Sequence, residues 1–281
     1  MLGNDVRRLL ACCLFMAGLA AASSHAHAAP VETVRFAGPD GTSLTGYLAR
    51  PARPTRTAKR PAVIALHGCG GPLNRRKTRL GKRHAAWADI LTRAGYVVLF
   101  PDSFGSRGHG SLCRMRPRPV GHRLRMKDVH AARKWLRQQA FVNPSRIAVL
   151  GWSNGGSTAL RVAAARGGRH YRAIIAYYPG CRRYLNRQRR SAAPLTILIG
   201  GADNWTPAGP CQALAGKWRA RIIVYPGAHH GFDSPRSRVR TLKGMAYSQS
   251  GNGSVRVGTH PVARRQSIAT VLTLLRQALG R

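Results

Sequence analysis

One serine of the sequence has the setting of an enzymatic nucleophile. Ser153 stands at the centre of Gly151-Trp-Ser-Asn-Gly155, after the apolar run 146–150 and before a predicted helix, 155–166. A serine between glycines on a tight strand-to-helix turn is known as a nucleophile elbow. The glycines let strand and helix approach closely, which leaves the hydroxyl clear of the backbone. We therefore expect Ser153 to attack a carbonyl; the alternative is a serine that only caps the helix.

A serine nucleophile needs a base to take its proton and an acid to hold that base. Between Ser153 and His230 the chain has a single carboxylate, Asp203, and both Asp203 and His230 closely follow predicted strands. We expect His230 to be the general base and Asp203 to fix its tautomer. Two alternatives remain: Asp203 is only a turn former, or His229 or His260 takes the place of His230.

Two backbone N–H groups are candidates for holding the negative charge that develops on the attacked oxygen. One is the N–H of Asn154, directly after the serine. The other is that of Cys69, in the glycine-rich segment His67-Gly-Cys-Gly-Gly71 that follows a predicted strand. The alternative interpretation of this segment is a flexible glycine turn.

Apolar runs bounded by turn residues predict eight strands, with helices alternating after the third. This order predicts an α/β fold, in which helices cover both faces of a mostly parallel sheet within one domain. Such sheets carry their sites at the carboxyl ends of strands. Residues 234–261 show no clear period, and we expect a loop there. The predicted strands are 31–37, 44–49, 62–66, 96–100, 146–150, 173–177, 195–199 and 221–225, and the predicted helices are 84–93, 123–139, 155–166, 208–219 and 264–279.

The N-terminal segment has the pattern of a signal peptide. Two arginines precede the apolar run 9–22, which is too short to span a bilayer, and Ala26-His27-Ala28 matches an A-x-A cleavage site. We expect residues 1–28 to be removed before Ala29. The remaining domain, 29–281, is then periplasmic or secreted. A lipoprotein is disfavoured because the cysteines of the leader lie inside its apolar run.

The composition is strongly basic, with 47 Lys and Arg against 8 Asp and Glu and a formal net charge of +39. Such a charge attracts polyanions and anionic membrane surfaces without selectivity. The cations are spread along the whole chain, and no helix-turn-helix, zinc finger or basic stretch interleaved with aromatics is present. We therefore expect no specific nucleic-acid partner. No C-x-x-C pair occurs, and neither a metal nor a cofactor is expected.

Five stretches resemble the dienelactone hydrolase family of α/β-hydrolases, in order over nearly all of the chain after the leader. The resemblance implies that Ser153 is the nucleophile, Asp203 the acid and His230 the base. Members that open dienelactones have Cys at the elbow, whereas this chain has Ser, which favours a small ester or lactone over the eponymous substrate. The stretches are 67–71, 101–108, 151–156, 201–207 and 225–233.

The resemblance also bears on the four cysteines that follow the leader. An even number in an oxidising compartment suggests two disulfides, with three possible connectivities. The resemblance places Cys69 and Cys113 after strands on one edge of the site, and Cys181 and Cys211 after neighbouring strands. We expect the pairs 69–113 and 181–211, with other pairings or free thiols as alternatives.

The residues that line the substrate pocket are the hardest to predict from the sequence. Trp152, Phe104, Trp205 and Tyr178 are candidates for its lining, although aromatic residues near strand ends more often belong to the core. Arg107 is a candidate contact for a substrate carboxylate. An exported serine hydrolase of a small ester or lactone is the first hypothesis. A peptidase of the same fold and a catalytically silent cationic protein that binds polyanions are the alternatives.

Overall fold

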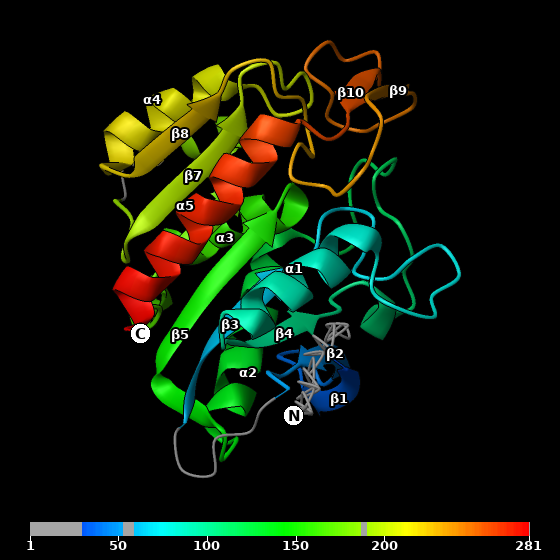
Figure 1. The fold of residues 1–281 in the computed structure, drawn as a ribbon. Helices are drawn as coiled ribbons and strands as arrows, with labels where there is room; N and C mark the ends of the chain where they lie inside the picture. Colours follow the sequence, from blue (N-terminus) through cyan, green and yellow to red (C-terminus); the bar gives the residue numbers. More distant parts are fainter. Residues whose placement is uncertain (1–29, 53–58, 187–189, 281) are drawn as a thin grey trace, which may run out of the picture.

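A mixed sheet of eight strands forms the centre of the molecule (Figure 1). The computed structural model describes residues 30–52, 59–186 and 190–280, so the predicted signal peptide lies outside the described residues. The strand order is β1-β2-β4-β3-β5-β6-β7-β8. Their bounds are β1 (Val31–Ala37), β2 (Ser43–Ala49), β3 (Arg60–Leu66), β4 (Val97–Pro101), β5 (Val142–Trp152), β6 (Ile174–Tyr177), β7 (Leu195–Gly200) and β8 (Arg221–Tyr225).

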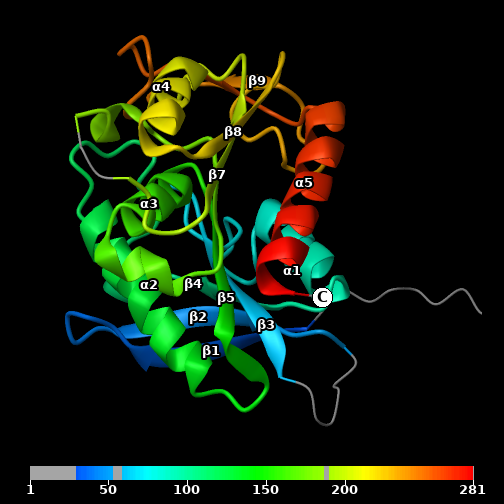
Figure 2. The same ribbon diagram turned by 90° about the vertical axis from the view of Figure 1, so that its left-hand side faces the viewer.

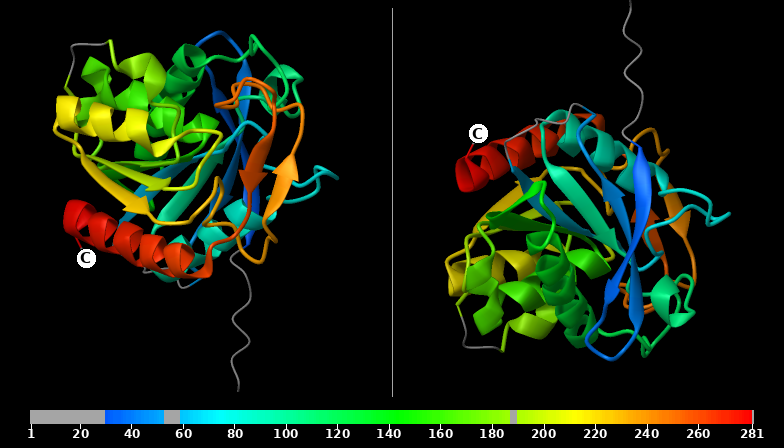
Figure 3. Two further views of the ribbon diagram at one scale, coloured as in Figure 1. Left: turned by 90° about the horizontal axis from the view of Figure 1, so that it is seen from above. Right: turned by 90° about the horizontal axis from the view of Figure 1, so that it is seen from below.

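Five helices cover the two faces of this sheet in the described residues. α1 and α5 lie on one face, and α2, α3 and α4 lie on the other (Figures 2 and 3). The predicted α/β fold with helices on both faces is thereby confirmed. The helix bounds are α1 (Lys82–Arg93), α2 (His122–Arg137), α3 (Asn154–Ala163), α4 (Ala208–Trp218) and α5 (Pro261–Leu279). Within the described ranges, none of the helices combines the length and apolar composition needed to cross a bilayer.

The burial of the strands explains why their sequences are so easily recognised. Every residue of β4, β6 and β7 is buried, because helices cover both faces of these parallel strands. β1, at the sheet edge, buries only Phe36 and pairs antiparallel with β2. A strand buried on both faces must be apolar throughout, so it appears in the sequence as an uninterrupted apolar run.

The order of the strands creates the site. From β3 the chain passes to β4 on one side and then crosses to β5 on the other side of β3. The loops that follow β3 and β5 therefore part at the carboxyl edge of the sheet. Crevices at such switch points are where open α/β sheets bind ligands. The segment after β3 contains Cys69, and the turn after β5 contains Ser153.

One structural expectation was wrong. Residues 234–261 are not an unstructured loop: β9 (Arg240–Leu242) and β10 (Val255–Val257) pair antiparallel in this segment, and α5 already begins at Pro261. Figure 1 shows this hairpin in orange, at the end of the molecule where the sheet's carboxyl edge lies. Strands of three residues are too short for an alternation of apolar and polar residues to be visible in the sequence. Val257 also bridges to His230, which joins the hairpin to the site.

Candidate active site

Ser153 occupies a strained turn between β5 and α3. Its backbone has φ 55° and ψ −114°, a conformation that costs energy for a residue with a side chain. The Ser153 N–H donates to the carbonyl of Tyr177 at 2.9 Å, which holds the turn against β6. A Cβ atom on Gly155 would lie 2.0 Å from the Leu66 carbonyl oxygen, so this position requires glycine. The turn therefore has the nucleophile-elbow geometry that the motif predicted.

The predicted nucleophile, base and acid lie in hydrogen-bond contact, and we call this set the relay: Ser153, His230 and Asp203. Nε2 of His230 is 2.9 Å from Oγ of Ser153, and Nδ1 of His230 is 2.8 Å from Oδ2 of Asp203. The Asp203 side chain is fully buried, and that of His230 is 6% exposed. A carboxylate accepts only, so Nδ1 carries the imidazole proton and the lone pair of Nε2 faces the serine hydroxyl. This arrangement is able to take a proton from Ser153.

Asp203 is both a turn former and the partner of the histidine. Its Oδ1 accepts from the backbone N–H groups of Trp205 at 2.9 Å and Thr206 at 2.8 Å. The Thr206 hydroxyl lies 3.0 Å from Asp203 Oδ2 and 3.0 Å from the Tyr178 carbonyl oxygen, so these acceptors share its one hydrogen. The turn thus orients one carboxylate oxygen toward His230. The sequence reasoning missed Thr206, because a threonine in a loop carries no distinguishing pattern.

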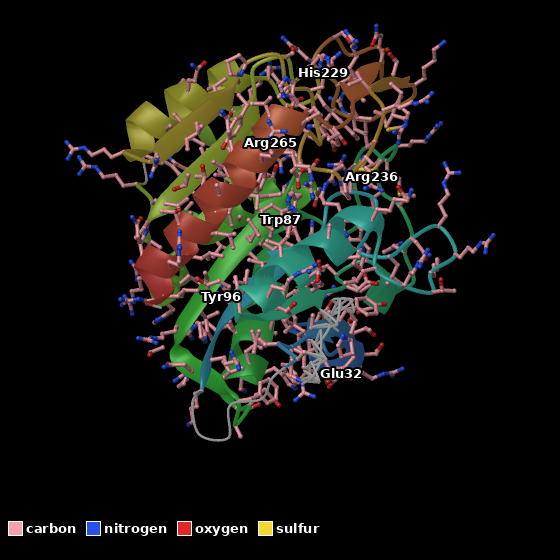
Figure 4. The ribbon with its side chains drawn as sticks, in the orientation of Figure 1. Glu32, Trp87, Tyr96, His229, Arg236 and Arg265 are labelled. Carbon is pink, nitrogen blue, oxygen red and sulfur yellow. A yellow bond between two sulfur atoms is a disulfide. The ribbon has the colours of Figure 1, made fainter. Side chains whose placement is uncertain are left out.

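The two rival histidines lie elsewhere. Nδ1 of His229 is 2.9 Å from the carbonyl oxygen of Ala202, and Figure 4 shows His229 beside the β9–β10 hairpin. Nδ1 of His260 accepts from the N–H of Ala263 at 3.2 Å and so caps the start of α5. Of the three candidates, His230 is the one in contact with Ser153.

Of the four aromatic candidates for the pocket, one lines it. Trp205 borders the cavity beside Ser153, and its ring centroid lies 4.8 Å from that of His230. Tyr178 packs against His230 at 4.5 Å and is fully buried, so it supports the imidazole from behind. Trp152 and Phe104 are also fully buried in the core. The expectation that aromatic residues near strand ends more often belong to the core is confirmed for these three, and their candidacy for the pocket lining is not.

Arg107 does not face the cavity either. Its guanidinium donates to Asp128 at 2.8 and 3.0 Å and to Asp40 at 2.9 and 3.0 Å. Arg107 beside Asp40 holds the pKa of that carboxyl well below its usual range. The prediction of a substrate contact was wrong, because this arginine is occupied by two carboxylates of the chain itself.

Both predicted oxyanion segments lie next to the serine. Asn154 is the first residue of α3, and the N–H groups of a helix's first turn have no acceptor within the helix. Cys69 follows Gly68, where an added Cβ atom would lie 3.6 Å from Cβ of Ser153. The segment after β3 therefore passes directly beside Ser153.

A buried arginine joins these two segments. Arg125 of α2 donates to Oδ1 of Asn154 and, at 2.9 Å, to the carbonyl oxygen of His67. Its guanidinium carbon lies 4.9 Å from the ring centroid of Phe104. Burial lowers the pKa of Arg125 to about 9, which leaves it protonated at neutral pH. The sequence did not single it out, because one arginine among 47 basic residues is not distinctive.

Both expected disulfides are present. Cys69 bonds to Cys113, and Cys181 bonds to Cys211, with Cα atoms 4.8 Å and 5.0 Å apart. The first bond attaches the segment after β3 to the long loop that follows β4. The second attaches the loop after β6 to α4. Two loops that border the site are thereby covalently anchored.

A cavity of about 590 Å³ opens beside the serine. Ser153, Asn154 and Thr206 form part of its wall, and the segment before β10 adds Tyr247 and Gln249. In the described part of the chain, no three His, Cys, Asp or Glu side chains gather where they would hold a metal ion.

A family model described as "Dienelactone hydrolase family" matches residues 44–279. A probable 2-oxo-3-(5-oxofuran-2-ylidene)propanoate lactonase from Bradyrhizobium sp is 26% identical over 219 residues, which cover 69% of this chain and 81% of that protein. A probable dipeptidyl-aminopeptidase B from Paracoccidioides brasiliensis (strain Pb18) is 31% identical over 142 residues, 50% of this chain. The chain spans only 15% of that peptidase's length.

The fold is shared with solved structures of low sequence identity. The crystal structure of a dienelactone hydrolase-like promiscuous phosphotriesterase from metagenomic libraries superposes with a TM-score of 0.67 at 18% identity. The superposition covers 90% of this chain and 100% of that chain. At this identity the likeness concerns the architecture of the sheet and its helices.

Proposed function

The chain belongs to the dienelactone hydrolase family, and we propose that it is a serine hydrolase that cleaves a small carboxylic ester or lactone. The observation that carries this proposal is the relay Ser153–His230–Asp203 at the wall of a cavity. An alcohol oxygen is a weak nucleophile until a base removes its proton. Here the base is already within hydrogen-bond distance and is held in the correct tautomer.

Acylation follows from this geometry. Oγ of Ser153 attacks the ester carbonyl carbon while Nε2 of His230 takes the hydroxyl proton. Asp203 stabilises the imidazolium that forms. The carbonyl oxygen becomes an oxyanion, which accepts from the N–H groups of Asn154 and Cys69. When the C–O bond to the leaving group breaks, His230 gives its proton to the departing oxygen, and the acyl group stays on Ser153.

Deacylation repeats these steps with water. Nε2 of His230 takes a proton from water as the oxygen attacks the acyl carbon, and the proton then passes to Oγ of Ser153 as the acid leaves. With a lactone, the departing oxygen of the first step remains attached to the acyl chain, so one product is released. Loss of one oxyanion donor typically lowers such a rate by about 10²- to 10³-fold.

Two alternatives have some support. A peptidase activity is favoured by the 31% identity to a probable dipeptidyl-aminopeptidase over half of this chain, although the chain spans 15% of that protein. A silent cationic binding protein is favoured by the net charge of +39. The relay argues against a catalytically silent protein, because a buried carboxylate, an oriented imidazole and a strained serine have no evident structural purpose together.

We also propose that the protein is exported and works in the periplasm or outside the cell. The signal-like pattern of residues 1–28 supports this, and so do the two disulfides, since such bonds persist mainly in oxidising compartments. Expression of the full chain in a bacterium, followed by mass measurement of the protein in the periplasmic fraction, tests it. The expected species begins at Ala29; an uncleaved cytosolic protein would refute the proposal.

Labelling with a fluorophosphonate probe tests the mechanism. We expect the wild-type protein to be labelled, and Ser153→Ala to be unlabelled at equal folded content by circular dichroism. A panel of 4-nitrophenyl esters, lactones and aminoacyl-4-nitroanilides then separates ester, lactone and peptide chemistry. Equal labelling of the two proteins, or a folded wild type that reacts with neither probe nor panel, would remove the proposed function.

A further inference from the structure

The cavity beside Ser153 has a strongly cationic wall. Among the described residues that line it are Arg116, Arg118, Arg182 and Arg183, and no carboxylate is among them. Arg116 and Arg118 come from the long loop after β4, whereas Arg182 and Arg183 come from the loop after β6. Two segments distant in sequence thus bring guanidinium groups to one cavity that also contains the nucleophile.

The carboxylates of the described residues are all engaged elsewhere, so none is available to these arginines. The chain has 8 Asp and Glu in total, and Asp5 alone lies outside the described ranges. An anion that pairs with the cavity arginines must therefore come from outside the folded domain. The engaged carboxylates are Glu32 with Arg50, Asp40 and Asp128 with Arg107, Asp89 with Arg93, Asp102 with the N–H groups of Phe104 and Gly105, Asp203 with His230, and Asp233 with Trp87 and Tyr178.

The arginines of the first loop are held in place. The guanidinium carbon of Arg118 lies 4.7 Å from the ring centroid of Tyr247, and that of Arg116 lies 5.4 Å from the same centroid. Nε–H of Arg118 also donates to the carbonyl oxygen of Leu112 at 2.9 Å. The nearby disulfide of Cys113 anchors this loop. Side chains held in this way lose little entropy when they bind a ligand.

The two loops also influence each other electrostatically across the cavity. Burial lowers the pKa of Arg118, and the charge of Arg183 lowers it further. The pKa of His122, another lining residue, is lowered by burial first and then by Arg183, Arg125 and Arg118. Like charges brought together without a counterion destabilise one another, and an anionic ligand relieves that repulsion.

The high charge of the whole chain does not by itself explain this arrangement. Scattered surface arginines point into solvent, where their charges are screened. Arg116, Arg182 and Arg183 are also exposed and Arg118 is half-buried, but all four border one cavity, and Arg116 and Arg118 lie over the same aromatic ring. Guanidinium forks match the oxygen spacing of carboxylate and phosphate groups.

Building on the proposed ester hydrolysis, we propose that this cavity selects esters whose body carries two or more negative charges, as carboxylate or phosphate groups. Arg118 and Arg183 contact these groups, with Arg116 and Arg182 at the rim. The aromatic faces of Trp205 and Tyr247 pack against the rest of the substrate. The ester carbonyl then lies at Ser153, and the charges remain remote from the bond that breaks.

A series of esters with one leaving group tests the proposal. The 4-nitrophenyl monoesters of butyrate, glutarate and tricarballylate carry zero, one and two free carboxylates, and a phosphorylated hydroxyacyl ester supplies the phosphate arm. For the purified full-length wild type we expect kcat/KM to rise at least about 10-fold from the neutral to the doubly charged ester, and to fall steeply with salt. Comparison of the tricarballylate and phosphate arms identifies the preferred anion.

Variants separate the cavity from the overall charge. The double variant Arg118→Gln/Arg183→Gln is expected to lower the ratio of kcat/KM for doubly charged to neutral ester by about 10- to 100-fold, the range for loss of charge-assisted hydrogen bonds. The matched control is Arg265→Gln/Arg276→Gln. It removes two charges from exposed positions of α5 outside the cavity lining (Figure 4 labels Arg265) and should leave the ratio unchanged.

Each outcome is decisive. An equal fall of the ratio in both double variants, or a wild-type ratio of one or less, would overturn the proposal and leave only a non-specific field. Fluorophosphonate labelling of the same preparations keeps this failure distinct from failure of the proposed function. If wild type is labelled and hydrolyses the neutral ester, serine hydrolysis holds and only the anion preference is lost.

Discussion

Arg125 provides the sharpest test of how the fold supports the candidate site. Arg125 is 1% exposed, and its guanidinium donates to the Asn154 side chain and to the His67 carbonyl, so it joins the two segments that would supply the oxyanion donors. In Arg125→Met the side chain keeps much of its apolar volume but loses both hydrogen bonds. The segments after β3 and β5 are then free to separate.

Two opposing terms set the effect on stability. Hydrogen bonds from a charged donor contribute about 1.5–3 kcal/mol each, so losing two costs about 3–6 kcal/mol. Burial lowers the pKa of Arg125, so Arg125→Met also removes the cost of keeping a charge in the interior. This second term opposes the first, and we expect a smaller fall of the melting temperature than the loss of two hydrogen bonds alone would cause.

The effect on catalysis has no such compensation. Each oxyanion donor is worth about 10²- to 10³-fold in rate, and partial misplacement of both should lower kcat about 10- to 100-fold with little change in KM. The rate of fluorophosphonate labelling should fall in parallel, because the phosphonyl oxygen would occupy the same donors. A merely structural arginine would move neither rate once the data are normalised to folded protein.

The assay compares wild type, Arg125→Met and Arg125→Lys by single-turnover ester hydrolysis, labelling rate and thermal melting. Lysine retains the charge but lacks the planar fork that reaches two acceptors at once, so its kcat should lie between the other two. A Met variant that melts normally and retains wild-type kcat would refute the reasoning.

Three further predictions concern the relay and the fold. Asp203→Asn should lower kcat about 10³- to 10⁴-fold through the wrong imidazole tautomer, measured on folded protein; a loss under 10-fold would exclude its role. Reduction of the Cys181–Cys211 bond, which spans 30 residues, should destabilise the domain by about 3–4 kcal/mol, tested by urea unfolding of Cys181→Ser/Cys211→Ser against wild type. His84 is buried and neutral, with a pKa lowered to about 4, so the unfolded chain binds more protons and stability falls as the pH drops from 6.5 toward 4. The variant His84→Gln should show a shallower loss, by up to about 3 kcal/mol, in melts across this range; an identical slope would contradict the assignment.

The sheet and the relay were predictable because their signals are local. Strands buried on both faces must be apolar throughout, and β4, β6 and β7 are. The elbow needs glycine where Gly155 meets the Leu66 carbonyl, and that requirement is visible as a motif. The scarcity of carboxylates left a single candidate for the acid, since only Asp203 lies between Ser153 and His230.

The lining of the cavity was not predictable for the opposite reason. Tyr247, Arg118 and Arg183 come from three separate segments, and nothing in the neighbouring sequence marks any of them. Tyr178 and Trp205 both follow strands, yet one is buried behind His230 and the other borders the cavity. A shift of one residue along a loop decides whether a side chain is buried or borders the cavity. The conformation of a loop in turn depends on the residues that pack against it.

The sequence by itself determined the α/β fold and the chain order of the candidate residues Ser153, Asp203 and His230, because burial and turn geometry limit which residues occupy strands and elbows. Only the tertiary structure decided that Arg107 forms ion pairs with Asp40 and Asp128. It likewise decided that the arginines beside the serine line a cavity in which no carboxylate of the described chain takes part. The attraction between two charges weakens with distance, so an ion pair forms only where the fold brings its partners close together. The spacing of residues in the sequence does not show which loops meet.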